Sequence, residues 1–444
     1  MVFFINFAKT KQMVSRRVFF KGLLLPLLAI LTCSCTGPRD EILRVYNWSD
    51  YIDPTVIEEF EQWYEEQTGK HVKVQYHTFD VNELMLTRIE KNHEDYDVVC
   101  PSDYIIEQML KADLLLPISH DFGDTPDYTV NISPYIHACF DRIEAGDKNG
   151  NDYAVGCVWG TTGIIYNAQY VTDEEASSWG ILRDPKFADK IFIKDSARDV
   201  FSQIILYLRQ EDLLSGKVTM DELMHDSSDE AIADVEAFMR QVKPLVAGWE
   251  SDFGKDQMVE ERGWISLNWS GEGVWTAKQA APLGIELKYA LPKEGFTVWF
   301  DGWVIPKYAK NTEAARYWIN FMCRPDVAIR NVQETGYTSA IATPEVLEAF
   351  VDEQYEPVNL SYFFGPEATA VRTNPVLYPD CADICRAAME HDWGERTKAL
   401  NAMWSRVKGE GTNMITAIVI GALLAILLGV AYYRRFRAAS PSDE

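Results

Sequence analysis

The chain has 444 residues, of which 47% are hydrophobic and 12% aromatic, and its formal net charge is −25 at pH 7. This length allows two domains with sizeable cores. The acidic balance argues against nucleic acid as a partner, because a phosphate backbone requires a basic surface, and it suits a cationic ligand.

Residues 1–35 are predicted to be an export signal and not part of the fold. Basic residues, including Arg16 and Arg17, precede an apolar run over residues 22–31 that is too short to span a bilayer. The arginine pair resembles a twin-arginine export signal, and an ordinary Sec signal is the alternative.

Cys35 is the candidate lipidation site. It follows Ser34 and resembles the cysteine of a bacterial lipobox, although Thr32 and Cys33 match that motif poorly. We expect lipidation at Cys35; simple cleavage or an uncleaved anchor is the alternative.

Strands and helices are predicted to alternate after the signal. The hydrophobic pattern indicates strands at 42–46, 72–76 and 96–100 and helices at 54–68, 82–91 and 104–113. This alternation favours an α/β fold with a parallel sheet. In such sheets ligands bind beyond the carboxyl ends of the strands, where residues 47–51 and 101–104 fall.

The middle of the chain is less regular. Residues 153–167 are apolar but contain three glycines, which predicts several strands around a crossover. Strands are also expected at 191–193 and 264–269, and helices at 200–209 and 311–323.

A second membrane signal lies near the C-terminus. Residues 412–433 carry no charge and are numerous enough for a transmembrane helix. Arg434, Arg435 and Arg437 follow, so the positive-inside rule places the tail, residues 434–444, in the cytoplasm and the body of the chain outside.

Sequence signatures of catalysis are lacking. The chain has no Gly-x-Ser-x-Gly elbow, no His-Glu-x-x-His and no Gly-Lys-Ser/Thr phosphate loop, so neither enzyme activity nor a cofactor or metal site is expected. The cysteines outside the signal are scattered, which argues against a disulfide framework; Cys381 and Cys385 could meet on a helix.

Aromatic residues stand beside carboxylates at three predicted strand ends. The clusters are Trp48 with Asp50 and Tyr51, Trp269 with Glu272, and Trp299 with Asp301. A linear polyamine is an apolar chain with a cationic nitrogen at each end, so binding it requires spaced carboxylates and aromatic faces. Each cluster by itself would suit core packing or loop capping equally well.

A family resemblance favours ligand binding for these clusters. From about residue 43 to 408 the chain resembles, in order, the bacterial spermidine/putrescine-binding proteins, periplasmic solute-binding components of polyamine ABC transporters. The matching motifs are residues 46–54, 96–102, 159–163, 197–201, 269–272, 292–295, 324–327 and 334–337.

The resemblance implies a two-lobed periplasmic-binding-protein fold, type II-like, with hinge crossovers. Lobe 1 is expected to comprise residues 41–161 and 301–346, and lobe 2 residues 162–300 and 347–408. The lobes would close on the ligand about the hinge.

The resemblance also implies the ligand-binding residues. Aromatic positions match Trp48, Tyr51, Tyr104, Trp269, Trp299 and Tyr337; polar or acidic positions match Ser102, Asp199 and Asp301; Asp50 and Glu272 fit acidic positions of the putrescine-type binders; and Glu390 is reached by counting on from residues 378–380. Asp199 replaces a glutamate of spermidine binders, and Ser196 replaces an aspartate. This loss of charge favours putrescine over spermidine.

The expected function is therefore extracytoplasmic polyamine binding for an ABC importer, with permease and ATPase subunits as partners. A polyamine-sensing ectodomain that signals through a membrane partner is the alternative. A polyamine-converting enzyme is disfavoured, because no cofactor site is visible in the sequence.

Overall fold

The computed structural model describes residues 38–251 and 253–409. The predicted export signal with Cys35, the predicted membrane helix at 412–433 and the tail lie outside these residues. Among the helices that the structure does describe, none combines the length and the apolar character needed to cross a bilayer.

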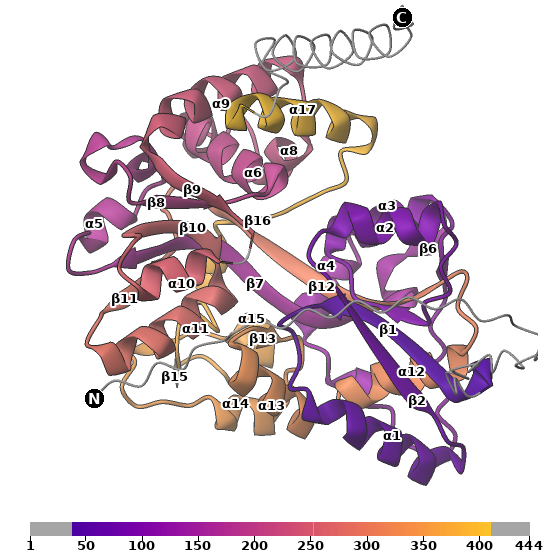
Figure 1. Ribbon diagram of the computed structural model, residues 1–444. Coiled ribbons are helices and arrows are strands. Elements are labelled where there is room, and N and C mark those ends of the chain that lie inside the picture. The colour runs from indigo at the N-terminus through magenta and orange to yellow at the C-terminus, as the bar shows by residue number, and fades with distance from the viewer. Residues whose placement is uncertain (1–37, 252, 410–444) are drawn as a thin grey trace, which may run out of the picture. The chain divides into compact units, whose positions relative to one another are not determined.

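One mixed sheet organises the described residues. Its strand order is β2-β1-β3-β12-β7-β10-β8-β9. Figure 1 shows β7 and β12 in the middle, with β1 and β2 on one side and β8 to β10 on the other. The bounds are β2 (Lys73–Phe79), β1 (Ile42–Trp48), β3 (Val98–Val99), β12 (Phe296–Pro306), β7 (Ala154–Asn167), β10 (Ile265–Trp269), β8 (Ile191–Lys194) and β9 (Val246–Glu250).

Short strands complete the sheet and form two small ribbons. Pairing with β7 or β12 are β4 (Leu115–Leu116), β11 (Leu287–Ala290), β13 (Thr338–Ser339) and β16 (Ala387–Met389). The ribbons are β5 (Glu144–Ala145) with β6 (Lys148–Asn149), and β14 (Pro357–Val358) with β15 (Val371–Arg372).

Helices connect the strands. Their bounds are α1 (Thr55–Thr68), α2 (Asn82–Glu90), α3 (Asp103–Lys111), α4 (Pro134–Phe140), α5 (Asp173–Ala176), α6 (Ala197–Leu208), α7 (Gln210–Leu214), α8 (Met220–His225), α9 (Asp229–Val242), α10 (Gly254–Val259), α11 (Ser270–Ala280), α12 (Thr312–Met322), α13 (Pro325–Thr335), α14 (Pro344–Ala349), α15 (Ser361–Phe364), α16 (Cys381–Ile384) and α17 (Thr397–Lys408).

The first strands and helices follow the sequence prediction closely. Strands β1, β2 and β3 pair in parallel, with α1 and α2 between them in sequence. Helix α1 ends where expected, because Gly69 adopts φ = 70°, a conformation that glycine tolerates without a Cβ penalty. It begins at Thr55 and not at Pro54, and Asp53 Oδ1 accepts the Thr55 N–H at 2.8 Å.

Residues 154–167 are one continuous strand, and the prediction of several strands there was wrong. The glycines do not interrupt β7; they make room for neighbours. A Cβ on Gly160 would lie 2.4 Å from Cζ2 of Trp299, and one on Gly156 would lie 2.6 Å from the Ile136 side chain. Glycine in a strand often marks such a close approach.

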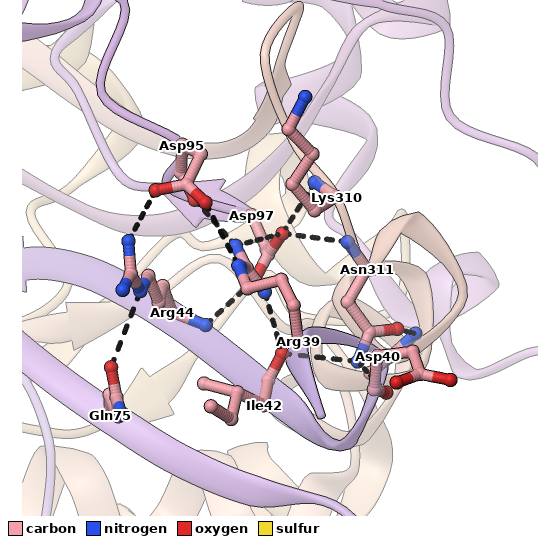
Figure 2. A network of polar contacts seen from close by, with 10 residues as sticks. Arg39, Asp40, Ile42, Arg44, Gln75, Asp95, Asp97, Lys310 and Asn311 are labelled. Carbon is pink, nitrogen blue, oxygen red and sulfur yellow. Dashed lines mark hydrogen bonds and ion pairs between the residues drawn. The ribbon is translucent and has the colours of Figure 1, made fainter. Parts of the chain in front are cut away.

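A polar network secures the start of the described chain. Figure 2 shows Asp97, which is fully buried, accepting hydrogen bonds from the Arg39 side chain and from the backbone N–H groups of Arg44, Lys310 and Asn311. Arg39 precedes β1 and Asp97 precedes β3. The network therefore lies at the amino ends of these strands, and their carboxyl ends remain for the candidate site.

Candidate functional site

One cavity of about 360 Å³ lies where the carboxyl ends of several strands meet. Residues from the ends of β1, β8, β9 and β10, from the middle of β12 and from the segment after β16 line this cavity. The structure brings all twelve predicted ligand-binding residues to its wall: Trp48, Asp50, Tyr51, Ser102, Tyr104, Asp199, Trp269, Glu272, Trp299, Asp301, Tyr337 and Glu390. Their role in binding stays a prediction.

Asp301 is the acidic residue of strand β12, and it is almost completely buried. The residue is 1% exposed, and its Oδ2 accepts the Tyr51 hydroxyl at 2.5 Å. Its Oδ1 has no hydrogen-bond partner among the described residues. Burial raises the pKa of the Asp301 carboxyl to about 7, although the nearby Ser102 and Tyr51 side chains act in the opposite direction. The free oxygen is suited to receive an N–H donor.

Aromatic side chains enclose this carboxylate. Ring centroids are 6.0 Å apart for Trp48 and Tyr51, 4.9 Å for Tyr51 and Tyr337, and 5.9 Å for Trp299 and Tyr337. The close fit depends on glycine, because a Cβ on Gly271 would lie 2.2 Å from Cδ1 of Tyr337. Aromatic faces of this kind bind methylene chains and ammonium groups.

A second acidic group lies at the start of α6. Ser196 caps this helix, with its Oγ accepting the Asp199 N–H at 3.2 Å, so Asp199 projects from the first turn. Asp199 Oδ1 accepts the Trp269 indole N–H at 3.0 Å. The Asp199 carboxylate is thereby joined to an aromatic face of the cavity.

Glu390 directly follows β16, which pairs in parallel with β12. It is 5% exposed, and its Oε1 has no partner among the described residues. Burial and the nearby charge of Asp199 raise the pKa of Glu390 to about 8, and Arg198 opposes this shift. Glu390 is thus a second buried carboxyl with an open acceptor.

Arg198 lies between two aromatic rings at this end of the cavity. Its guanidinium carbon is 3.7 Å from the Tyr104 ring centroid and 4.0 Å from that of Trp393, and it donates to the His391 carbonyl at 2.7 Å. Sequence reasoning missed Arg198 as a cavity residue, although it stands inside a motif that the family resemblance quoted.

Two of the predicted binding residues, Glu272 and Asp50, are paired with lysines. Lys194 Nζ lies 2.9 Å from Glu272 Oε1 and 3.3 Å from Glu250 Oε1. Asp50 is 56% exposed in its side chain and pairs with Lys255 at 2.8 Å. Glu272 keeps one oxygen, Oε2, without a partner among the described residues.

Sequence reasoning also missed Lys194, Glu250 and the tryptophans Trp393 and Trp404, all of which line the cavity. Asp103, in the segment 101–104 that was expected at this edge of the sheet, lines it too. Asp103 is buried, and burial followed by the charge of Glu390 raises its pKa well above the usual range. A lysine that ends an apolar strand, as Lys194 does at 191–194, was the available sequence signal.

The cavity wall therefore combines acidic side chains with aromatic surface. Among the described residues, ten acidic and two basic side chains line it, together with eight tyrosines and tryptophans. Such a wall favours a ligand with several N–H donors, positive charge and an apolar skeleton.

The six cysteines in the described residues are all free, Cys381 and Cys385 included.

Comparison with known proteins places the chain in a family. Residues 56–356 match the model of the bacterial extracellular solute-binding protein family. The spermidine/putrescine-binding periplasmic protein of Salmonella typhimurium is 28% identical over 384 residues, which are 86% of this chain and 95% of that protein. The putrescine-binding periplasmic protein PotF of Escherichia coli is 25% identical over 381 residues, 82% of this chain and 90% of its own.

Solved structures agree on the fold. A putative spermidine/putrescine ABC transporter protein from Listeria monocytogenes aligns with a TM-score of 0.65 and 28% identity, covering 83% of this chain and 99% of its own. A spermidine/putrescine ABC transporter substrate-binding protein from Streptococcus pneumoniae aligns with a TM-score of 0.61 and 26% identity, covering 83% and 98%. The predicted α/β periplasmic-binding-protein fold is confirmed. The chain therefore belongs to the bacterial extracellular solute-binding protein family, and it is a binding protein rather than an enzyme.

Proposed function

We propose that the protein captures a small polyamine for an ABC importer. One observation carries the proposal: Asp301, Glu390 and Glu272 each keep a buried carboxylate oxygen without a partner among the described residues, and all three line one aromatic-walled cavity. An unmet buried acceptor is costly, and the ammonium groups of a polyamine supply the missing N–H donors. Relatives that are named as spermidine/putrescine-binding and putrescine-binding proteins support this ligand class.

The proposed binding motion uses the long strands. Lobe 1 comprises residues 41–161 and 301–346, and lobe 2 residues 162–300 and 347–408. Strands β7 and β12 pass from one lobe to the other and act as the hinge. Tyr51 and Asp301 then belong to lobe 1, while Glu390 and Trp269 belong to lobe 2. A ligand that contacts both sets favours closure through its differential binding to the closed state.

Putrescine is the favoured ligand. Ser196 is neutral and is used as a helix cap, with its Oγ bound to the Asp199 N–H. Asp199 is one methylene shorter than glutamate and already accepts the Trp269 indole N–H. Both facts weaken a distant site for the third ammonium of spermidine, which would be expensive to bury without a partner.

Thermal unfolding with a ligand panel tests the ligand class. Putrescine and spermidine are expected to raise the Tm of the full-length protein, because a ligand that binds only the folded state stabilises it by about 2.7 kcal/mol at a hundredfold excess over Kd. Butylamine, which has one ammonium, and neutral amino acids serve as controls. If butylamine stabilises the protein as much as putrescine does, paired carboxylate recognition is wrong.

Membrane attachment at both ends is part of the proposal. It rests on the lipobox-like Cys35 and on the uncharged residues 412–433 followed by three arginines. Protease added to intact spheroplasts is expected to degrade residues 41–408. If residues 41–408 become sensitive to protease only after the membrane is permeabilised, this topology is contradicted.

A further inference from the structure

Lys194 is a cation that the protein itself places in the cavity. It ends strand β8, is 1% exposed and lines the cavity beside Trp269. We propose that Lys194 acts as a built-in ammonium that fills one cation position of the cavity and so favours diamines over triamines. This inference rests on the proposed function and adds a residue that determines specificity.

The surroundings of Lys194 match those that a polyamine end would require. Its Nζ lies 2.9 Å from Glu272 Oε1, 3.3 Å from Glu250 Oε1 and 3.0 Å from the Ser251 carbonyl oxygen. It also lies 4.2 Å from the Trp269 ring centroid. A carboxylate and an aromatic face are the two contacts that bind an alkylammonium.

The backbone fixes this arrangement. Strand β8 pairs in parallel with β9, which sets Lys194 opposite Glu250, and with β10, whose end leads into the first turn of α11 and Glu272. The Lys194 ammonium donates hydrogen bonds to the Ser251 carbonyl oxygen and to Glu272 Oε1, and it forms an ion pair with Glu250. Lys194 therefore acts on a ligand by its charge and by occupying space.

The consequence is a limit on the number of ligand ammonium groups. An amine brought to Glu272 or to the covered face of Trp269 would meet the like charge of Lys194. Among the other acids that line the cavity, Asp301, Asp103 and Glu390 are buried, and Asp199 is partly buried. Asp301 and Glu390 suit the two ends of a diamine. At Glu272 the third ammonium of spermidine would face Lys194.

Titration calorimetry with putrescine and spermidine tests the inference on the full-length protein. The wild type is expected to bind putrescine at least about tenfold more tightly than spermidine, which corresponds to about 1.4 kcal/mol. Lys194→Met removes the charge at similar side-chain length, and Lys194→Gln keeps an amide N–H for the two carboxylates. Both are expected to shift the ratio of the two Kd values about tenfold or more towards spermidine.

Two further variants isolate the cause. Lys194→Gln combined with Glu272→Gln removes the carboxylate that the single change frees, so the ratio should return towards the wild-type value. Lys288→Met is the matched control, because Lys288 also contacts two carboxylates, Asp173 at 3.3 Å and Glu286 at 3.5 Å, but does not line the cavity. It should leave the ratio within about twofold of the wild-type value.

The outcomes separate the inference from the function on which it rests. A wild type that prefers spermidine contradicts the inference even if neither Lys194 variant folds. A folded variant with an unchanged ratio also overturns it, while polyamine binding itself stands. If the wild type binds neither putrescine nor spermidine, the proposed function fails and the inference fails with it.

Discussion

Asp301→Asn is expected to weaken putrescine binding by at least about a hundredfold, because a bound ammonium in a closed site would lose its carboxylate. Removing one partner of a buried ion pair costs about 3–5 kcal/mol. Asn retains the size of Asp and an oxygen for the Tyr51 hydroxyl, which now lies 2.5 Å from Asp301 Oδ2. Calorimetric titration of the variant and the wild type at the same pH measures the loss.

Asp50→Asn is the matched control for this change. Asp50 also lines the cavity, but its side chain is 56% exposed and paired with Lys255, so solvent and salt screen its charge. The putrescine affinity of Asp50→Asn is expected to fall by no more than about threefold. Trp299→Ala should lose an intermediate amount of binding free energy, roughly 1–2 kcal/mol, because cation–π and methylene contacts are removed. Equal binding by Asp301→Asn and the wild type would show that the site is misplaced.

Polyamine affinity is expected to rise about tenfold or more between pH 6 and pH 8. Burial raises the pKa of Asp301 to about 7 and that of Glu390 to about 8, so without ligand both carboxyls hold protons over much of this range. A cationic ligand binds the carboxylate forms and must displace these protons. The ligand amines stay charged, because alkylammonium pKa values lie near 10.

The raised pKa values of Asp301 and Glu390 also determine how the free energy of unfolding changes with pH. A carboxyl whose pKa is higher in the folded state binds more protons there than in the unfolded chain, so the unfolding free energy of the ligand-free protein falls as pH rises from about 4 to about 8. Calorimetry in buffers of different ionisation enthalpy should show proton release on binding at pH 7. Affinity that is flat or falls between pH 6 and 8 would contradict the assigned carboxyls.

Local sequence patterns predicted the elements that place the site. The hydrophobic pattern predicts strands β1 and β2, and Gly69 marks the end of helix α1. Because β1 and β2 are parallel, their carboxyl ends lie at the same edge of the sheet. Trp48 and Ser102 were expected at such ends, and the structure places both at the cavity. The family resemblance supplied residues distant in sequence, such as Tyr337.

Pairings between distant elements could not be predicted from local patterns. Lys194 and Glu272 are 78 positions apart, and their contact depends on the register of β8 beside β10. Periodicity alone does not fix that register. The glycines of β7 were misinterpreted for a related reason. They leave space for the side chains of Trp299 and Ile136, which come from other segments of the chain.

The measurement that tests polyamine capture most directly is a calorimetric titration of putrescine into the full-length protein at pH 8, where the cavity carboxyls are more fully ionised. We predict saturable binding of one putrescine per chain, lost in Asp301→Asn and retained in Asp50→Asn. A cooperatively folded wild type that shows no saturable binding of putrescine or spermidine would contradict it.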